Sequence, residues 1–337
     1  MSARWYLRLA ILATVLAFGV IVLGAYVRLS AAGLGCPDWP GCYGHVGVPD
    51  THASIAQADS THPNRPVQPG RAWKEMVHRY FAGSLATLIL ILAIAAWWRR
   101  KQTHRPVLLP SLLLLTVIFQ ALLGMWTVTL LLFPPVVMGH LLGGFTTFAL
   151  LILLVLQSGD WLRYRVQTRD FMRWLAVAGL IVLICQIALG GWTSSNYAAI
   201  ACPDFPTCQA QWWPAGMDFH DGFAWHGVGQ DYQGGILTQA ARMAIHVTHR
   251  IGALVTFLTL LGTSLVFMLK GGNRGLKWLG ALVGVLVLIQ VGIGISIVEL
   301  GLPLPLADAH NGVAALLLGS VVALVWGAWS RRVESEH

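Results

Sequence analysis

The sequence predicts an all-α polytopic membrane protein whose eight transmembrane helices form two pseudo-symmetric four-helix bundles. Three observations support this fold class. The chain of 337 residues has a mean hydropathy of +0.66 with only 11% charged residues. Its apolar residues gather in eight long blocks, and its two halves share motifs in the same order. A composition this apolar excludes an ordinary soluble domain.

Eight apolar blocks supply the predicted transmembrane helices. A helix needs roughly 20 mostly apolar residues to cross the hydrocarbon core, and an isolated strand would leave its backbone unpaired in lipid. The blocks lie near residues 7–27, 74–98, 107–129, 136–157, 171–193, 238–268, 276–298 and 306–329. The first block is too long for a cleavable signal peptide, and no small-residue cleavage site follows it closely.

The basic residues predict the orientation of the helices. Of the 22 Lys and Arg residues, 15 lie at the two termini or after the second, fourth and sixth blocks. They are Arg4, Arg8, Arg99, Arg100, Lys101, Arg105, Arg163, Arg165, Arg169, Arg173, Lys270, Arg274, Lys277, Arg331 and Arg332. Because Lys and Arg accumulate on the cytoplasmic side, both termini are expected in the cytoplasm, and the odd-numbered connections face outward. The charge forms no single groove, so nucleic acid is not an expected partner.

An internal repeat divides the chain into a half at 1–165 and a half at 166–337. Three matches in order, at nearly constant offset, indicate duplication of a four-helix unit. The matching pairs are CPDWPGC at Cys36–Cys42 with CPDFPTC at Cys202–Cys208, Glu75–Arg79 with His246–Arg250, and His140 with His310. An even number of helices per half makes the repeats parallel, related by an axis along the membrane normal.

Each outward cysteine pair, Cys36 with Cys42 and Cys202 with Cys208, has five residues between its members. The outer side of a bacterial inner membrane is oxidising, so each pair is expected to form a small disulfide loop. The loop is either a structural staple or a labile, redox-active bond. Thiol-metal binding is disfavoured because thiols do not stay reduced there. Cys185, inside the fifth block, is expected to pack in the core.

Five histidines lie inside predicted helices, and four of them occupy matching positions near the outward starts of the even-numbered helices. Those four are His78, His140, His249 and His310, and His246 is the fifth. Ionisable groups inside a membrane are costly and therefore functional candidates. No specific role is expected for the other histidines, which are His45, His52, His62, His104, His220, His226 and His337.

One histidine pair in each half suits axial ligation of a heme iron in a bundle core. A single zinc or copper site would need both halves to share all four rings. Small residues at Gly139, Gly143 and Gly144 could let a flat porphyrin approach closely. Arg79 and Arg250 directly follow a histidine, and each either pairs with heme propionates or extends to the membrane interface.

The two halves differ at the position three residues before the first histidine of each pair. The first half has Glu75 there and the second has His246. A carboxylate beside one site and not the other indicates a division of labour, in which one site reacts. Alternatively, Glu75 forms an i, i+4 ion pair with Arg79.

These residues resemble the heme A synthase family, and the paired cysteines are similar to those of its cysteine-containing bacterial branch. The matching features run in order over nearly the whole chain. They are Gly24-x-x-x-Arg28, Glu75-x-x-His78-Arg79, His140, His249-Arg250 and His310.

The resemblance implies an oxidoreductase that converts the C8 methyl group of heme O to a formyl group through a hydroxylated intermediate, giving heme A for cytochrome oxidase. It implies a substrate site in the N-terminal half and a heme b cofactor in the C-terminal half. The implied roles are substrate binding for His78 and His140, assistance of the oxidation for Glu75, and heme b ligation for His249 and His310. A heme O synthase, an electron acceptor and a second copy of the chain are possible partners.

Two other functions compete with this interpretation. A bis-histidine diheme cytochrome would normally stack its hemes across the membrane, whereas these histidines share one depth. A heme transporter would bind heme unchanged, and Glu75 together with the family resemblance disfavours it.

Overall fold

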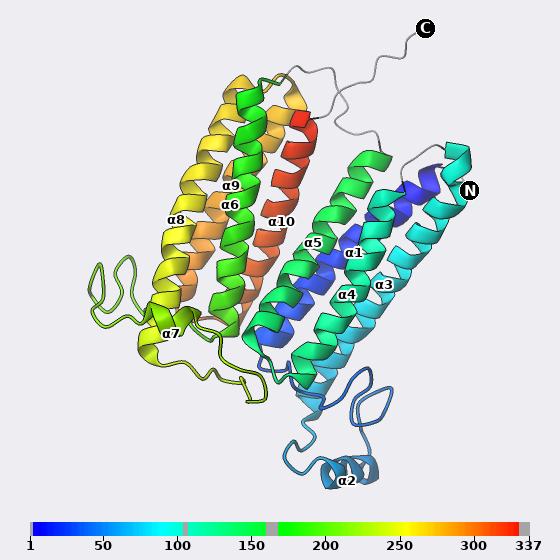
Figure 1. Ribbon diagram of the computed structural model, residues 1–337, viewed down its shortest axis with the longest axis vertical. Helices are drawn as coiled ribbons and strands as arrows, with labels where there is room; N and C mark the ends of the chain where they lie inside the picture. Colours follow the sequence, from blue (N-terminus) through cyan, green and yellow to red (C-terminus); the bar gives the residue numbers. More distant parts are fainter. Residues whose placement is uncertain (1–2, 104–106, 160–167, 330–337) are drawn as a thin grey trace.

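The computed structural model describes residues 3–103, 107–159 and 168–329, and within these ranges the chain forms helices and no strand (Figure 1). Eight of the helices are long and apolar enough to cross a membrane, which confirms the predicted fold class. They are α1 (Ala3–Leu29), α3 (Pro69–Thr103), α4 (Leu108–Thr129), α5 (Pro134–Ser158), α6 (Asp170–Ser195), α8 (Gln239–Lys270), α9 (Arg274–Glu299) and α10 (Leu304–Trp329).

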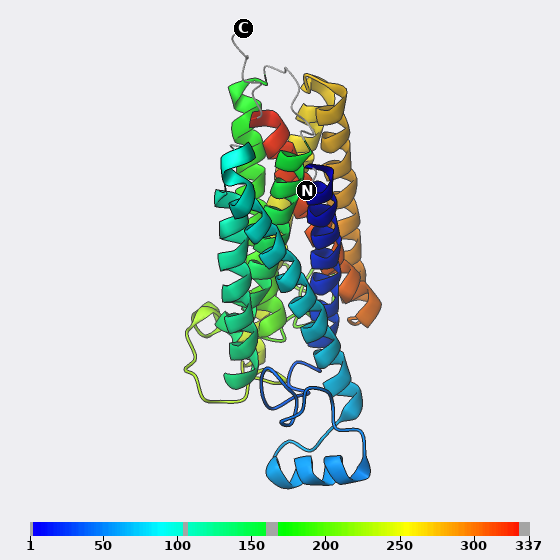
Figure 2. The same cartoon turned by 90° about the vertical axis from the view of Figure 1, so that its right-hand side faces the viewer.

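Two short helices, α2 (His52–Thr61) and α7 (Phe219–Phe223), lie in the long connections after α1 and α6, which the hydropathy pattern predicts only as loops. Both are fixed by local caps. The hydroxyl of Thr51 accepts a hydrogen bond from the backbone N–H of Ser54 (3.2 Å), and the Ser54 hydroxyl accepts one from the backbone N–H of Thr51 (3.1 Å). Figure 2 shows α2 beyond the ends of the long helices. These caps carry no hydropathy signal, so the pattern of apolar blocks misses them.

The long helices pack mainly within their own halves. In the first half α1 and α4 each contact both α3 and α5, and in the second half α6, α8, α9 and α10 contact one another in a closed ring. The halves meet where α10 packs against α1 and α5, and where α5 packs against α6 (Figures 1 and 2). As a result, 61% of the residues in the most apolar stretch of α10 are buried, against 22–39% in the corresponding stretches of the other long helices. The seam between the halves therefore passes beside α1, α5, α6 and α10.

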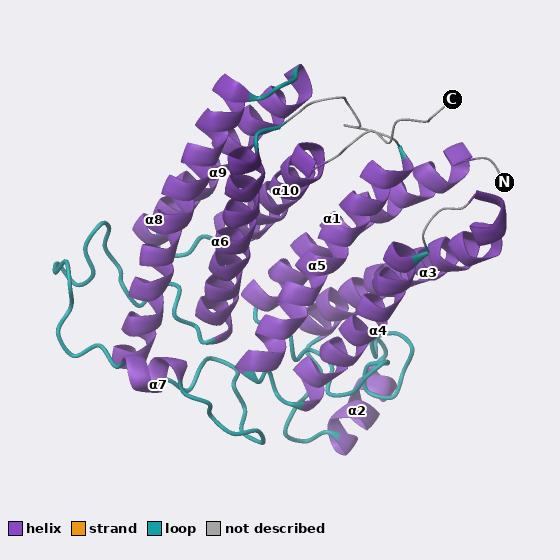
Figure 3. Cartoon of the chain, turned by 45° about the horizontal axis from the view of Figure 1, so that its top comes forward, coloured by secondary structure: helices purple, strands orange, loops and turns teal. Residues whose placement is uncertain are grey.

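Within the described residues, one end of the bundle carries the long connections. Figure 3 shows the segments after α1 and α6 gathered at that end, while α1 begins and α10 ends at the other. The described basic residues of the predicted cytoplasmic set lie at or near helix ends on the side opposite the long connections. The rest of that set, Arg105, Arg163, Arg165, Arg331 and Arg332, lies outside the described residues, as do His104 and His337.

The prediction for Cys185 is wrong, because its side chain is exposed on the surface of α6 rather than packed in the core. Apolar residues such as Ile181 (56% exposed) and Ile184 (45% exposed) share this surface. A transmembrane helix is apolar on its lipid-facing side as well as its packed side, so apolarity does not distinguish the two faces.

Candidate functional site

Each of the four membrane histidines packs its ring against a glycine of the preceding long helix. A Cβ atom added at that glycine would lie 2.9 Å from Cε1 of the ring in one case and 3.3 Å in the other three. The pairs are His78 with Gly24 (2.9 Å), His140 with Gly124, His249 with Gly190, and His310 with Gly294. A side chain at any of these positions would displace a ring, so the glycines permit the close approach.

These four contacts lie at matching depth. Gly24, Gly124, Gly190 and Gly294 each stand five residues before the last residue of their helix. At a rise of 1.5 Å per residue this is about 7.5 Å inside the C-terminal end of each helix. The four rings therefore lie at one level of the bundle, as the sequence predicted. That this level is near the outer face of the membrane stays a prediction.

The histidines interact in pairs within each half. His78 is within electrostatic range of His140, and His249 is within range of His310. Across the described ranges no three His, Cys, Asp or Glu side chains converge as a metal-ion site. Two imidazoles per half suit an iron that four porphyrin nitrogens already hold. They are too few for a metal ion such as zinc, whose structural sites take four protein ligands.

The buried ring nitrogens also fit a ligand-holding role. The Nδ1 atoms of His78, His140 and His310 are buried without a hydrogen-bond partner in the described structure. His249 differs, because the side-chain amide of Gln186 lies 3.1 Å from its Nδ1 and also donates to its backbone carbonyl. The repeat places Val20 where Gln186 stands, so this contact belongs to the C-terminal half alone.

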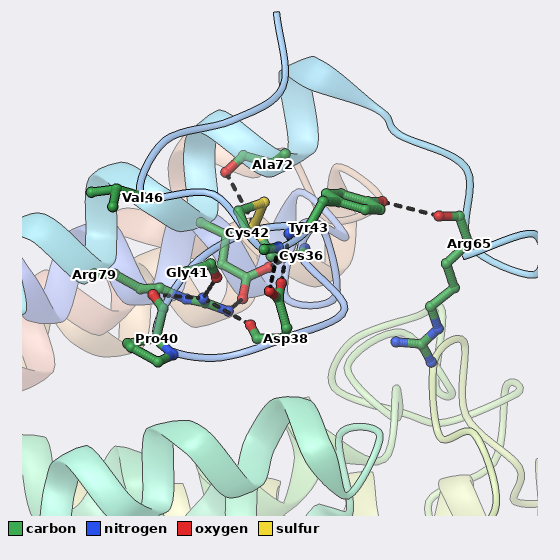
Figure 4. The surroundings of a disulfide bond; sticks show 12 residues. Cys36, Asp38, Pro40, Gly41, Cys42, Tyr43, Val46, Arg65, Ala72 and Arg79 are labelled. Atoms are coloured by element: carbon green, nitrogen blue, oxygen red, sulfur yellow. Dashed lines mark hydrogen bonds and ion pairs between the residues drawn. A yellow bond between two sulfur atoms is a disulfide. The ribbon is translucent and has the colours of Figure 1, made fainter. Parts of the chain in front are cut away.

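The first disulfide loop sits directly on α3 (Figure 4). Cys36 and Cys42 are bonded, with their Cα atoms 4.9 Å apart. Asp38 closes the turn by accepting hydrogen bonds from the backbone N–H of Tyr43 (2.6 Å) and of Gly44 (2.7 Å). The guanidinium of Arg79 donates to the carbonyl oxygens of Asp38, Pro40 and Gly41. The structure therefore adds a third possibility for Arg79, namely that it anchors this loop.

Glu75 is buried (5% exposed) between Arg79 and the loop. Its Oε2 accepts a hydrogen bond from the backbone N–H of Cys36 (3.0 Å), and its Oε1 pairs with the Arg79 guanidinium. The i, i+4 ion pair considered from the sequence is therefore present. It holds the carboxylate one helical turn from His78, on the same face of α3.

The second disulfide loop repeats this arrangement on α8. Cys202 is bonded to Cys208, and Asp204 accepts hydrogen bonds from the backbone N–H of Gln209 (2.6 Å) and of Ala210 (2.9 Å). The Thr207 hydroxyl also donates to Asp204, and this bond, ahead of the backbone bonds, lowers the pKa of the Asp204 carboxyl.

His246 occupies the position of Glu75 and makes the matching contact. The backbone N–H of Cys202 donates to its Nδ1 (3.2 Å), and its Nε2 lies 3.3 Å from Nε of Arg250. Arg250 in turn donates to the carbonyl oxygens of Thr207 (2.8 Å) and Cys202 (2.9 Å). His246 is therefore a buried loop anchor, and it also lies within electrostatic range of His249.

Several residues of the site were not predicted from the sequence. The four ring-contacting glycines carry a signal, since each lies near the end of an odd-numbered apolar block. Gln186 carries none. Of the three glycines that were predicted to admit a porphyrin, Gly139 faces Leu123 and Gly143 faces Gln120 on α4. A Cβ added at the third, Gly144, would meet nothing within 4 Å.

Comparison with known proteins agrees with these motifs. Residues 7–322 match the family model COX15-CtaA, described as cytochrome oxidase assembly protein. The chain is 44% identical over 337 residues to a heme A synthase of Shewanella oneidensis, covering 98% of each protein. It is 26% identical to a heme A synthase of Halalkalibacterium halodurans, covering 83% of each. The chain therefore belongs to the heme A synthase family of cytochrome oxidase assembly proteins.

Proposed function

We propose that this protein is a heme A synthase, an oxidoreductase that converts the C8 methyl group of heme O to a formyl group through a hydroxylated intermediate. The observation that carries the proposal is the repeated histidine–glycine contact, which gives each half a pair of imidazoles at one depth. The identity to a heme A synthase over 98% of both chains supports the same reaction. The product would serve the assembly of cytochrome oxidase.

In this proposal the two halves have different tasks. His78 and His140, in the half at 1–165, hold the substrate heme O, and His249 and His310, in the half at 166–337, hold heme b. When bound, heme b supplies a store for electrons passing through the protein. The second half is suited to a resident cofactor because Gln186 contacts the ring of His249 and restricts its rotation.

Glu75 is the residue proposed to assist the oxidation. Removing electrons from a methyl group on a conjugated macrocycle leaves positive charge, which a fixed carboxylate stabilises. The same carboxylate can instead act as a base towards water. Its bonds to Arg79 and to the Cys36 N–H keep it fixed beside His78. In the other half His246 has no carboxylate to offer, which agrees with a site that does not react.

The proposed setting is the bacterial inner membrane, with both termini in the cytoplasm and both disulfide loops outside. Eight candidate spans support the multi-pass arrangement, and the distribution of Lys and Arg supports the orientation. A heme O synthase is the proposed source of substrate. An electron acceptor completes the reaction, because oxidation of a methyl group to an aldehyde releases electrons.

The test is to express the chain together with a heme O synthase in cells that lack their own heme A pathway, and to separate the extracted hemes by chromatography. Heme A, or its hydroxylated intermediate, is the expected product. Bound but unaltered heme O under aerobic conditions, with both disulfides intact, would contradict the proposal and indicate a heme carrier instead.

A further inference from the structure

Arg28 crosses the seam between the two halves at the outward end of α1. Its guanidinium donates to the backbone carbonyl of Ser194 (2.8 Å), makes a longer contact with that of Ser195 (3.4 Å), and lies 4.1 Å from the ring centroid of Tyr197. The carbonyls belong to the last turn of α6, so a cation from the first half closes a helix end of the second. Ser194 is also the repeat counterpart of Arg28, so only the first half brings a charge to this place.

Two polar groups at this contact, the Nε–H of Arg28 and the hydroxyl of Tyr197, are buried and make no hydrogen bond of ordinary geometry. The two side chains lie close enough for a weak hydrogen bond with each other, and no other partner satisfies them. Leaving buried donors unpaired is unfavourable. A helix-capping role accounts for the Nη contacts of Arg28 but not for these two groups, which together offer two donors to an anion.

The arginines that directly follow the membrane histidines are engaged elsewhere. The terminal nitrogens of Arg79 donate to Glu75 and to three loop carbonyl oxygens. Arg250 donates through Nη1 and Nη2 to the carbonyl oxygens of Thr207 and Cys202, and its Nε lies 3.3 Å from Nε2 of His246. Of these three arginines, all in described parts of the chain, Arg28 alone has a buried N–H that lacks an acceptor.

The position of Arg28 relates it to the first histidine pair. Arg28 follows Gly24 by four residues, so it lies one turn further outward on the same face of α1. Gly24 is the glycine against which His78 packs. A porphyrin held by His78 carries its two carboxylates on one edge, and about 6 Å separates the level of that ring from the level of Arg28.

We infer that Arg28 and Tyr197 form a carboxylate-binding site that takes a propionate of the porphyrin held by His78. This inference rests on the proposed function, since it requires the first half to hold heme O. Arg28 would donate through Nε and an Nη, and Tyr197 through its hydroxyl, in the charge-assisted geometry that arginine forms with carboxylates. Because Tyr197 comes from the second half, substrate binding would draw on both halves.

The test compares ferric mesoporphyrin with its dimethyl ester, whose carboxylates are blocked, as ligands of the purified full-length protein in detergent. The absorbance change that is lost in His78→Ala defines binding at the first site. The wild type is expected to prefer the diacid by about tenfold, the value of one charge-assisted hydrogen-bonded pair. Arg28→Gln is expected to lose most of this preference. Tyr197→Phe, which removes only the hydroxyl, is expected to lose part of the preference.

Arg173→Gln is the matched control, because Arg173 also donates to a helix-end carbonyl, that of Ala328, and lies over the Trp329 ring at the other end of the bundle. It should keep the full preference. If Arg28→Gln folds poorly, Arg28→Met, which also removes the charge, and Tyr197→Phe decide the question. An undiminished preference in these variants would overturn the carboxylate site. Porphyrin binding that does not depend on His78 would overturn it as well, and would identify the proposed substrate site as the failing step.

Discussion

The disulfide loops at Cys36–Cys42 and Cys202–Cys208 have nearly the same structure but are anchored by different side chains. Both loops contain a cis proline, at Trp39–Pro40 and Phe205–Pro206. Both place an aspartate under the turn and an arginine of the following long helix against the loop carbonyls. Yet the backbone N–H of the first cysteine is received by Glu75 in one half and by His246 in the other.

That difference separates two tasks of the Glu75 position, namely anchoring the disulfide loop and the proposed assistance of the oxidation. A neutral imidazole suffices to hold the loop, as His246 does, so loop anchoring alone does not require a carboxylate. Loop anchoring therefore does not explain why the first half has a carboxylate at Glu75, and the proposed function gives it the task of assisting the oxidation. The predictions below test this division, starting with the changes expected to have the largest effect.

Removing one proposed ligand from each half should separate the halves most clearly. His78→Ala and His249→Ala are both expected to abolish heme A formation. Only His249→Ala should lose the heme that copurifies with the protein, because the second half is proposed to hold a resident cofactor and the first a substrate. Bound heme in purified protein, measured by its pyridine complex, checks this. Equal heme loss in the two variants would contradict the division of labour.

Glu75→His would give the first half the anchor of the second. Because His246 holds an equivalent loop, the Cys36–Cys42 disulfide and the porphyrin content should stay close to wild type. Conversion of heme O should fall by about 100-fold, the low end of the range for loss of a general acid–base or charge-stabilising group. Chromatography of extracted hemes gives the conversion. The reverse change, His246→Glu, is the control and should leave conversion within about twofold, since a glutamate there can anchor the loop as Glu75 does in the first half.

Substituting the glycine that contacts a histidine ring should weaken porphyrin binding more where the contact is closer. A Cβ at Gly24 would lie 2.9 Å from His78, whereas one at Gly190 would lie 3.3 Å from His249. Overpacking of this kind costs about 1–3 kcal/mol, so Gly24→Ala should weaken porphyrin binding by roughly tenfold and Gly190→Ala by less. Porphyrin titration of the two variants gives the order. Gly19→Ala is the control, because a Cβ there meets nothing within 4 Å.

The features predicted from the sequence are those that depend on hydropathy and on spacing along one helix. The eight long helices follow from apolar block length, and the matching depth of the four histidines follows from their positions near helix starts. Both rest on local properties of the chain.

What the sequence did not predict depends on contacts across the fold. The partner of each histidine ring is a glycine on another helix, and the acceptor for the Cys36 N–H lies 39 residues away. Arg28 reaches a helix end 166 residues later in the chain. A residue type alone does not specify such partners. The sequence therefore left Arg79 either to pair with heme propionates or to extend to the membrane interface, and it did not predict the hydrogen bonds of Arg79 to the loop.

The smallest expected effect is the pH dependence of the second disulfide loop, which differs from the first loop by the hydroxyl of Thr207. Thr207 donates to Asp204 (2.5 Å), while the repeat counterpart of Thr207 is Gly41, which has no side chain. This bond lowers the pKa of Asp204 in the folded protein below its ordinary value of 3.8. The stabilisation is therefore present above 3.8 and is lost as the pH falls through the lower, folded-state pKa.

Reduction of the Cys202–Cys208 disulfide by a phosphine, followed by mass spectrometry, reports opening of this loop. In the wild type the rate should rise as the pH falls below 3.8, because protonated Asp204 no longer accepts all of its hydrogen bonds. Asp204→Asn should be reduced faster than the wild type above that pH, with no comparable rise below it. Thr207→Val should shift the wild-type rise to higher pH, since the carboxyl loses its leading hydrogen-bond donor. A rise at the same pH in Thr207→Val and wild type would show that the hydroxyl does not set the difference between the loops.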